Sequence, residues 1–233
     1  MRKAKADQIP SISSNSKQRN LSPQVSKAVR DFGRGFVEQT LIILGKAEMI
    51  KTKEDLKYYI KRDYLARYGK KKPTINIKIK TGIMFRYNVV LRKAEYHLNN
   101  DHKVASLFYR FRLYRLGLRL GWSIDPNTFG PGMCIVHYGT VIVNPNARIG
   151  ENARLQAGVN IGANAGENAA PQIGDNVYFG PGAKVFGNII IASNVAIGAN
   201  AVVNKSCLSE GVTLGGVPAR IISQNGTERM ITR

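Results

Sequence analysis

The chain has three histidines, His97, His102 and His137, and only His137 stands in a setting that suggests chemistry. It lies in segment 135–140, among mainly apolar residues, where a polar ring is unusual. An imidazole titrates close to neutral pH, so it can accept a proton from a reacting group and return it. A lone histidine among apolar residues is more often a hydrogen-bonded structural residue. The residues alone leave both interpretations open.

Neither cysteine marks a site clearly. Cys134 and Cys207 cannot form a disulfide framework, and no CxxC spacing indicates a structural metal, so a reducing compartment is the simplest interpretation. Cys134 stands three residues before His137, an arrangement that a covalent thiol route could use. A role as a small apolar filler is favoured for Cys134. We expect no bound metal.

The segment that must position His137 repeats every six residues. Ten of eleven consecutive positions at this spacing are aliphatic or aromatic, namely Val143, Ile149, Leu155, Ile161, Ile173, Phe179, Val185, Ile191, Ile197 and Val203. The residues two positions earlier are mostly small or β-branched, and glycine often comes next after the apolar residue. One step back from Val143 reaches His137, which would put the imidazole in an apolar slot. Only the position of Glu167 breaks the phase.

A period of six fits neither an α-helix nor a simply alternating strand. Short strands joined by glycine- or asparagine-rich corners form a triangular parallel β-helix with three hexapeptides per turn, because such corners need left-handed backbone angles. The polar segment 163–172 carries the break in phase, and the repeat resumes at Ile173. We therefore expect a loop that leaves the coil there. Loops that interrupt a repeat usually serve a site, which disfavours a pure scaffold.

The repeat contains five short motifs: Ile-Gly-Glu-Asn at 149–152, Ile-Gly-Asp-Asn at 173–176, Gly-Asn-Ile at 187–189, Ile-Gly-Ala-Asn at 197–200 and Gly-Val-Pro-Ala-Arg at 216–220. With them the chain resembles the left-handed β-helix acyltransferases, most closely their serine acetyltransferase branch, which includes relatives in polysaccharide biosynthesis. The resemblance is strong over 122–223 and weaker before it. It implies an α+β chain, in which an N-terminal helical region precedes a left-handed parallel β-helix with one extruded loop. It also implies a homotrimer with sites at subunit interfaces, and acetyl-CoA as co-substrate.

By this resemblance His137 is the general base for direct acetyl transfer. It would take the proton of an attacking hydroxyl and then protonate the departing thiolate. The serine acetyltransferases pair this histidine with an aspartate just upstream, and Ser123 stands at the matching position here. Asp125 could replace that aspartate, or a backbone carbonyl could hold the ring. Asp125 could equally cap the turn before Pro126. His137 and Asp125 are the candidate catalytic residues.

The loop departs from the family as well. The serine enzymes carry a histidine before the proline that closes the loop, where this chain has Ala170 before Pro171. The loop also looks shorter than that of the serine enzymes. These two changes in the loop weaken the case for serine as acceptor. We therefore expect acetylation of a hydroxyl on a bacterial capsular or extracellular polysaccharide or its sugar precursor. The alternatives are serine O-acetylation for cysteine biosynthesis and a non-enzymatic basic scaffold that binds an anionic polymer.

The resemblance also assigns residues to acetyl-CoA. Pro181 and Ala199 are 18 residues apart, one full coil, so they should stack at one corner and flank the pantetheine arm. The complete set of expected contacts is Gly162, Gly180, Pro181, Ala199, Asn204, Lys205 and Arg220. Cations suit the CoA phosphates. The metal-dependent carbonic anhydrases of related fold need three histidines around the coils, and only one lies in this repeat.

The first half of the chain has helical spacing, which predicts helices over 22–68, 85–98 and 104–120 with a break at 69–73. The last of these is the most amphipathic, and its apolar line consists of Val104, Leu107, Phe108, Phe111, Tyr114 and Leu118. Four arginines, Arg110, Arg112, Arg115 and Arg119, lie largely away from that line. We divide the chain into a mobile basic tail (1–21), a helical basic domain (22–121), the β-helix (122–223) and a C-terminal tail (224–233).

The formal charge of +20 is concentrated in the helical half. Up to Trp122 there are 28 basic and 9 acidic residues, a balance of +19, whereas the remainder has a balance of +1. Three interpretations stay open: a cap with solvated charge, attraction to an acidic polymer or an anionic membrane surface, and nucleic-acid binding. No nucleic-acid motif is visible, which disfavours the last. No apolar run is long enough for a signal peptide or a membrane span, so we expect a cytoplasmic protein, at most peripheral at the inner face of the membrane.

Overall fold

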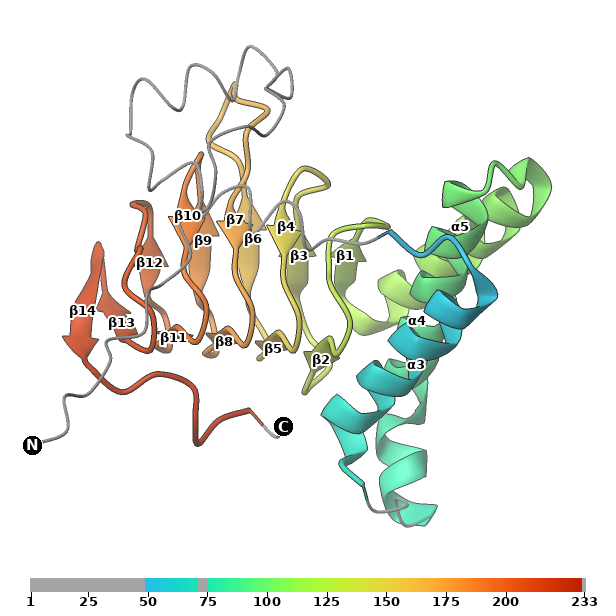
Figure 1. Ribbon diagram of the computed structural model, residues 1–233, viewed down its shortest axis with the longest axis horizontal. Coiled ribbons are helices and arrows are strands. Elements are labelled where there is room, and N and C mark those ends of the chain that lie inside the picture. Colours follow the sequence, from blue (N-terminus) through green and yellow to red (C-terminus); the bar gives the residue numbers. More distant parts are fainter. Residues whose placement is uncertain (1–48, 71–74, 232–233) are drawn as a thin grey trace, which may run out of the picture. The chain divides into compact units, whose positions relative to one another are not determined.

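The computed structural model describes residues 49–70 and 75–231, without the side chains of 76–81, and these residues all belong to the unit Gln39–Arg233. Three helices come first, α3 (Lys53–Tyr68), α4 (Ile75–Asn99) and α5 (Lys103–Leu120), and short strands follow from Trp122 to Ser223 (Figure 1). The predicted fold class, a helical region followed by a left-handed parallel β-helix, is confirmed. The expected tail 1–21 and the expected helix start at 22 lie outside the described residues.

The strands form three sheets, which we call A, B and C. Sheet A contains β1 (Trp122–Ile124), β3 (Val141–Val143), β6 (Asn160–Gly162), β9 (Lys184–Phe186) and β12 (Val202–Val203). Sheet B contains β4 (Arg148–Ile149), β7 (Gln172–Ile173) and β10 (Ile190–Ile191). Sheet C contains β2 (Cys134–Ile135), β5 (Arg154–Leu155), β8 (Tyr178–Phe179), β11 (Ala196–Ile197), β13 (Thr213–Gly216) and β14 (Ala219–Ser223). All the pairs are parallel except β13 with β14, so each strand stacks on the strand one coil earlier.

The six-residue repeat builds the core. All ten apolar residues of the predicted phase point inward and are at most 3% exposed. Stacked residues are 18 apart in the regular coils, as for Ile173 and Ile191, but 24 apart across the interruption, as for Ile149 and Ile173. The loop 163–171 therefore adds six residues and returns to the same phase, as the sequence predicts.

The prediction that His137 occupies an apolar slot is wrong. Ile135 pairs with Leu155, and these two stacked residues are 20 apart, two more than in a regular coil. The extra residues fall in the turn 136–140 between β2 and β3, where His137 is exposed. Ile135, which is fully buried, fills the inward position instead.

The helices begin and end where local chemistry favours it. A capping box starts α3: the Thr52 hydroxyl accepts from the Asp55 N–H at 3.0 Å, and the Asp55 carboxylate accepts from the Thr52 N–H at 2.8 Å. Gly69, with a φ of 66°, ends α3. Helix α4 starts at Ile75, ten residues before its predicted start, whereas α5 agrees with its predicted range to within one residue. None of the described helices is long and apolar enough to cross a membrane.

The first coil has no earlier coil to pair with, so its backbone groups need other partners. Buried Arg92 of α4 donates to the carbonyls of Phe129 at 2.9 Å and Gly130 at 2.7 Å. Asp63 of α3 accepts from the backbone N–H groups of Gly132 and Met133, at 2.8 and 2.9 Å. The helices thus close the open end of the β-helix.

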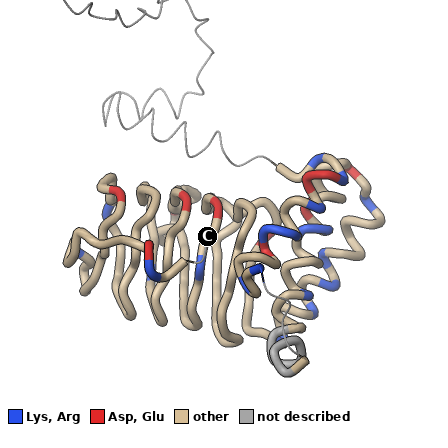
Figure 2. The backbone as a smooth tube through the Cα atoms, turned by 60° about the horizontal axis from the view of Figure 1, so that its bottom comes forward, with Lys and Arg blue, Asp and Glu red and all other residues tan. Residues whose placement is uncertain are grey.

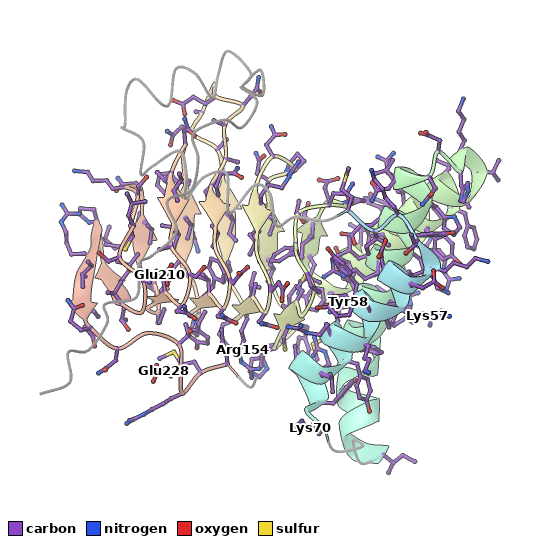
Figure 3. The ribbon with its side chains drawn as sticks, viewed as in Figure 1. Lys57, Tyr58, Lys70, Arg154, Glu210 and Glu228 are labelled. Carbon is purple, nitrogen blue, oxygen red and sulfur yellow. The ribbon has the colours of Figure 1, made fainter. Side chains whose placement is uncertain are left out.

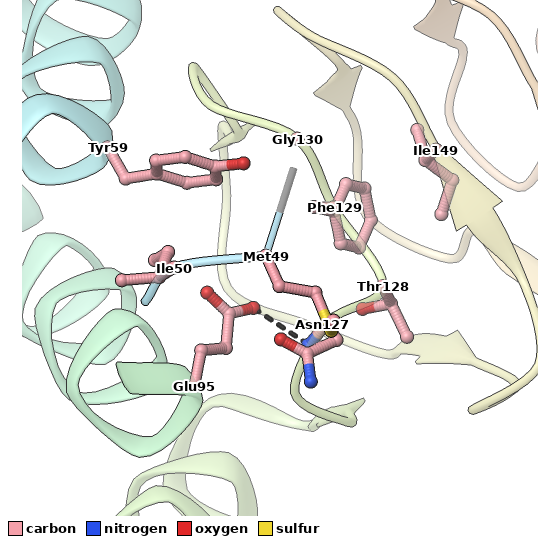
Figure 4. A pocket seen from close by; sticks show the side chains of 9 residues that line it. All are labelled: Met49, Ile50, Tyr59, Glu95, Asn127, Thr128, Phe129, Gly130 and Ile149. Carbon is pink, nitrogen blue, oxygen red and sulfur yellow. Dashed lines mark hydrogen bonds between the residues drawn. The ribbon is translucent and has the colours of Figure 1, made fainter. Parts of the chain in front are cut away.

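Further side chains complete this closure. Asn88 donates to the Met133 carbonyl at 2.9 Å, and Arg67 donates to the Ile135 carbonyl at 2.7 Å. The Glu95 carboxylate accepts from the backbone N–H of Asn127 at 2.9 Å, beside a cavity of about 20 Å³ (Figure 4). That volume holds about one water molecule.

The closing side chains form a buried ionic cluster. Arg92 lies 2.9 Å from Asp63 and 3.1 Å from Glu95, and all three side chains are at most 2% exposed. Burial raises the pKa of Glu95, while the guanidinium of Arg92 opposes that shift. Burial alone would lower the pKa of Arg92, but the carboxylates of Asp63 and then Glu95 raise it above its ordinary value. The guanidinium therefore stays charged inside the protein.

An asparagine ladder ties the coils along the corner between sheets B and C. Asn152 donates to Asn176 at 2.9 Å, and Asn176 donates to Asn194 at 3.1 Å. All three residues have positive φ values, between 56° and 63°, which asparagine tolerates better than most residues. Arg62 of α3 donates to Asn152 at 2.7 Å, so the ladder starts at the helical region.

We predict that Arg92→Met lowers the free energy of unfolding by about 3–5 kcal/mol, because it leaves two buried carboxylates without their cation. Urea unfolding followed by circular dichroism measures this change. The control is Arg86→Met on the exposed side of the same helix, which should change the free energy by less than about 0.5 kcal/mol. Equal effects of the two substitutions would contradict the proposed closure.

Candidate active site

One corner of the β-helix carries His137 together with Pro181 and Ala199. This C/A corner consists of the turns that lead from sheet C to sheet A, at 136–140, 156–159, 180–183 and 198–201. Backbone hydrogen bonds join successive turns. The N–H of Gly158 donates to the carbonyl of Thr140 at 2.7 Å, that of Gly182 to the carbonyl of Ala157 at 2.9 Å, and that of Asn200 to the carbonyl of Pro181 at 2.8 Å. The predicted stacking of Pro181 and Ala199 is therefore present, on the same edge as His137.

The edge continues to the C-terminal hairpin. Strand β13 ends at Gly216, and Arg220 of β14 pairs with Gly215. Neighbouring strands lie about 4.8 Å apart, so the four spacings of sheet C from β2 to β13 span about 19 Å. Arg220 is exposed, and its guanidinium donates to the carbonyl of Ala219 at 2.9 Å. A straight row of turns thus connects the histidine with a cation.

The remaining predicted residues lie on the opposite edge of sheet A. Gly162 ends β6, Asn204 and Lys205 follow β12, and Asp125 follows β1. Asn204, Lys205 and Asp125 are exposed. The structure therefore divides the predicted set between two edges, one at each end of the sheet A strands.

Asp125 and His137 lie at opposite ends of β1. The turn 136–140 passes over the start of β1, where Gly139 N–H donates to Leu120 and Val141 N–H donates to Gly121, each at 2.9 Å. Asp125 follows the other end, where its backbone carbonyl accepts from the Thr128 hydroxyl at 2.8 Å. No hydrogen bond or ion pair joins the Asp125 and His137 side chains within the described chain. Ser123, at the family's aspartate position, is exposed in β1 itself.

His137 is open to solvent, as are its neighbours Tyr138 and Thr140. The other two histidines contact each other: the Nδ1 atoms of His97, in the last turn of α4, and of His102, just before α5, are 3.1 Å apart. Burial, followed by the charges of His102 and Lys93, lowers the pKa of His97. An exposed imidazole can meet an acceptor and exchange a proton with it. His102 is exposed as well but lies beside His97 at the helices, so His137 is the exposed histidine of the β-helix.

The covalent thiol route finds no support at Cys134. Its side chain is buried, and burial raises the pKa of its thiol, an effect that the guanidinium groups of Arg67 and Arg154 oppose. A neutral thiol is a poor nucleophile. Among the described residues, no group of three histidine, cysteine or acidic side chains could hold a metal ion.

Lys184 is a positioning residue of the corner that the sequence analysis does not include. Its ammonium group donates to the carbonyls of Gly158 at 2.7 Å and Gly182 at 2.8 Å, so it ties two successive turns together. Its outward position on β9 could have identified it, because a lysine there can reach the neighbouring corner. Ala170, at the family's loop histidine position, is 2% exposed and belongs to the core.

Comparisons with known proteins support the fold. The family model described as bacterial transferase hexapeptide (six repeats) matches residues 170–205. A serine acetyltransferase of Staphylococcus xylosus is 36% identical over 149 residues, which cover 59% of this chain and 68% of the relative. The crystal structure of serine acetyltransferase from Brucella abortus strain S19 has a TM-score of 0.63 at 24% identity, covering 87% of this chain and 81% of that one. A structure of the Brucella abortus enzyme with coenzyme A has a TM-score of 0.60 at 20% identity, covering 87% and 93%.

The tight stacking at this corner predicts the effect of Gly180→Ala. A Cβ atom at Gly180 would lie 2.7 Å from the backbone nitrogen of Ala199, so the next turn must shift. We expect the free energy of unfolding to fall by about 1–3 kcal/mol, as measured by urea unfolding. Gly82→Ala is the matched control, because its Cβ would meet no heavy atom within 4 Å and alanine favours a helix. An unchanged stability of Gly180→Ala would refute the close stacking.

Proposed function

Because this chain belongs to the serine acetyltransferase family of hexapeptide-repeat transferases, we propose that it transfers the acetyl group of acetyl-CoA to the hydroxyl of serine. It is an acyltransferase, as its relatives are. The single observation that carries the proposal is the exposed imidazole of His137 at the head of the row of turns that ends near Arg220. The related Brucella structure with coenzyme A supports the choice of donor.

The polysaccharide acceptor expected from Ala170 and the shorter loop is wrong. Staphylococcal relatives at 35–36% identity are serine acetyltransferases. This similarity supports serine, and not a sugar hydroxyl, as the proposed acceptor of this chain. Both changes lie in the loop in which the serine enzymes carry the additional histidine. They remove neither the base nor the coils beside the donor, so they do not identify a different acceptor.

His137 is the proposed general base of the reaction. As the serine Oγ attacks the thioester carbonyl carbon, an imidazole nitrogen takes the hydroxyl proton and a tetrahedral intermediate forms. The carbon–sulfur bond then breaks, and the imidazolium gives its proton to the departing thiolate. The products are O-acetylserine and free CoA, and the imidazole returns to its starting form. An open site at the turn 136–140 lets acceptor and donor meet at the same ring.

We predict that His137→Ala lowers kcat with serine by 10²- to 10⁴-fold, the usual contribution of a positioned base. Release of the CoA thiol from acetyl-CoA measures the rate. His102→Ala removes an exposed imidazole outside the β-helix and should keep the wild-type rate. A wild-type rate in His137→Ala would refute the base, and no thiol release by the wild-type protein with serine would refute the acceptor.

Asp125→Asn belongs in the same assay. If the Asp125 carboxylate positions His137, its replacement by an amide should lower kcat and shift the pH profile of the reaction. A turn residue would change only stability. The placement of Asp125 at the far end of β1 favours the turn role, and we expect kcat within about twofold of wild type.

We further propose that the protein is a homotrimer with acetyl-CoA bound between two copies. An extended donor along the C/A corner of one chain follows a single edge of sheet A. Asn204 and Lys205 lie on the other edge, so they reach such a donor most directly from a neighbouring copy. Light scattering of the purified protein measures the number of copies.

The exposed cations predict a contribution to donor binding. Lys205→Gln and Arg220→Gln should each raise the KM for acetyl-CoA about two- to fivefold with little change in kcat, because exposed charge pairs contribute about 0.2–1 kcal/mol. The effect should disappear with acetyl-pantetheine, which lacks the nucleotide phosphates. Lys57→Gln on α3 is the control (Figure 3). An equal increase with acetyl-pantetheine would contradict phosphate recognition.

A further inference from the structure

Helix α5 exposes its apolar line instead of burying it. Val104, Leu107, Phe108, Phe111, Tyr114 and Leu118 are between 51% and 86% exposed. The opposite face packs into the protein through Ser106, Leu113, Leu116, Gly117 and Leu120. The line that the sequence marks as amphipathic therefore faces outward, and no described part of the chain covers it.

Cations border this apolar line on both sides. At about 100° per residue, Lys103 and Arg110 lie along one side, and Arg112 and Arg119 lie along the other. Arg115 falls within the edge of the line on that second side, between Val104 and Phe108. The helix contains no acidic residue. Figure 2 shows Lys and Arg gathered on the helices, whereas the coils carry few charges of either sign.

The side with three arginines forms a recess that suits an anion. A hollow of about 210 Å³ is lined by Arg86 of α4 and by Arg112, Arg115, Leu116 and Arg119 of α5. None of these arginines forms an ion pair within the described residues. The Arg112 guanidinium lies 5.5 Å from the centre of the Phe108 ring, so charge and apolar surface are continuous.

We propose that α5 lies in the plane of an anionic phospholipid bilayer, with its apolar line in the acyl boundary and its arginines on the lipid phosphates. A helix with large apolar side chains on one face and cations beside them has the composition of an interfacial helix. Arginine and lysine stems can lie along the apolar surface while their charges reach the headgroups. The 18 residues of α5 give about 27 Å of contact.

Charge and apolar character together select this partner. A second copy of the same face would bring five cations against five without an acidic residue to pair with them. A soluble acidic polymer would satisfy the arginines but leave Leu107, Phe108 and Phe111 in water. An anionic bilayer satisfies both groups at once.

The test is sedimentation of the full chain with vesicles of phosphatidylglycerol and with vesicles of phosphatidylcholine. We expect binding to the anionic vesicles, weak binding to the zwitterionic ones, and a loss as salt rises. Phe108→Ser combined with Phe111→Ser should lower the affinity at least tenfold. Arg112→Gln combined with Arg115→Gln should lower it about 25-fold, from roughly fivefold per cation near an anionic surface.

The matched controls remove exposed apolar side chains and exposed cations that lie outside α5. Leu208→Ser with Ile222→Ser takes away two exposed apolar side chains, and Lys53→Gln with Lys57→Gln takes away two exposed cations of α3. Both control proteins should bind the anionic vesicles like the wild type. Binding that is unchanged in the serine pair on α5 would overturn the proposal.

Two further results would also overturn it. If the apolar line of α5 joins two copies of the protein, replacing Phe108 and Phe111 lowers the molar mass measured without lipid. In that case the wild-type protein does not bind vesicles. If a soluble acidic polymer is the partner, heparin binds the wild-type protein and the double variant Phe108→Ser, Phe111→Ser equally, and vesicles bind neither protein. Each outcome is read on the same purified proteins.

Discussion

The bonds from the buried Arg92 cluster to the first coil determine whether this β-helix can exist as a separate molecule. A parallel coil extends by edge pairing, so its first turn presents unpaired backbone groups in a row. Arg92 and Asp63 supply donors and acceptors to that row, and Asn88, Arg67 and Glu95 complete it. The ion cluster is stable in the interior because its charges are bonded to each other and to the backbone. The closure holds segment 127–135, which leads directly into the turn that carries His137.

The core of the β-helix could be predicted from the sequence because every coil imposes the same demand. Each inward position must fill the centre of a narrow prism, so large apolar residues recur at a fixed step from Val143 to Val203. His137 was predicted in the wrong environment because a step of six assumes equal turns. Two extra residues between Ile135 and Val141 change the phase, and nothing in the composition of that turn marks them. The separation of Asp125 from His137 likewise depends on which corner each turn occupies.

In the helical half, the spacing of apolar residues is not enough to predict which face of a helix is buried. The spacing of apolar residues in α5 identifies a face, but it does not say whether protein or another phase covers that face. Both faces of α5 are rich in large apolar residues, because Leu113, Leu116 and Leu120 line the buried one. Gly117 marks the buried face, since a Cβ atom there would collide with the backbone carbonyl of Trp122. That close approach is visible only in the structure.

The loop 163–171 has a consequence for how such proteins diversify. Because it leaves and rejoins the coil one full hexapeptide later, its ends stay on their own strands whatever lies between them. Changes in its exposed part, 164–168, leave the stacking above and below intact, whereas Ala170 and Pro171 belong to the coil itself. Variation at the exposed part of the loop is thereby uncoupled from the C/A corner, so this surface can change while the framework of coils stays the same.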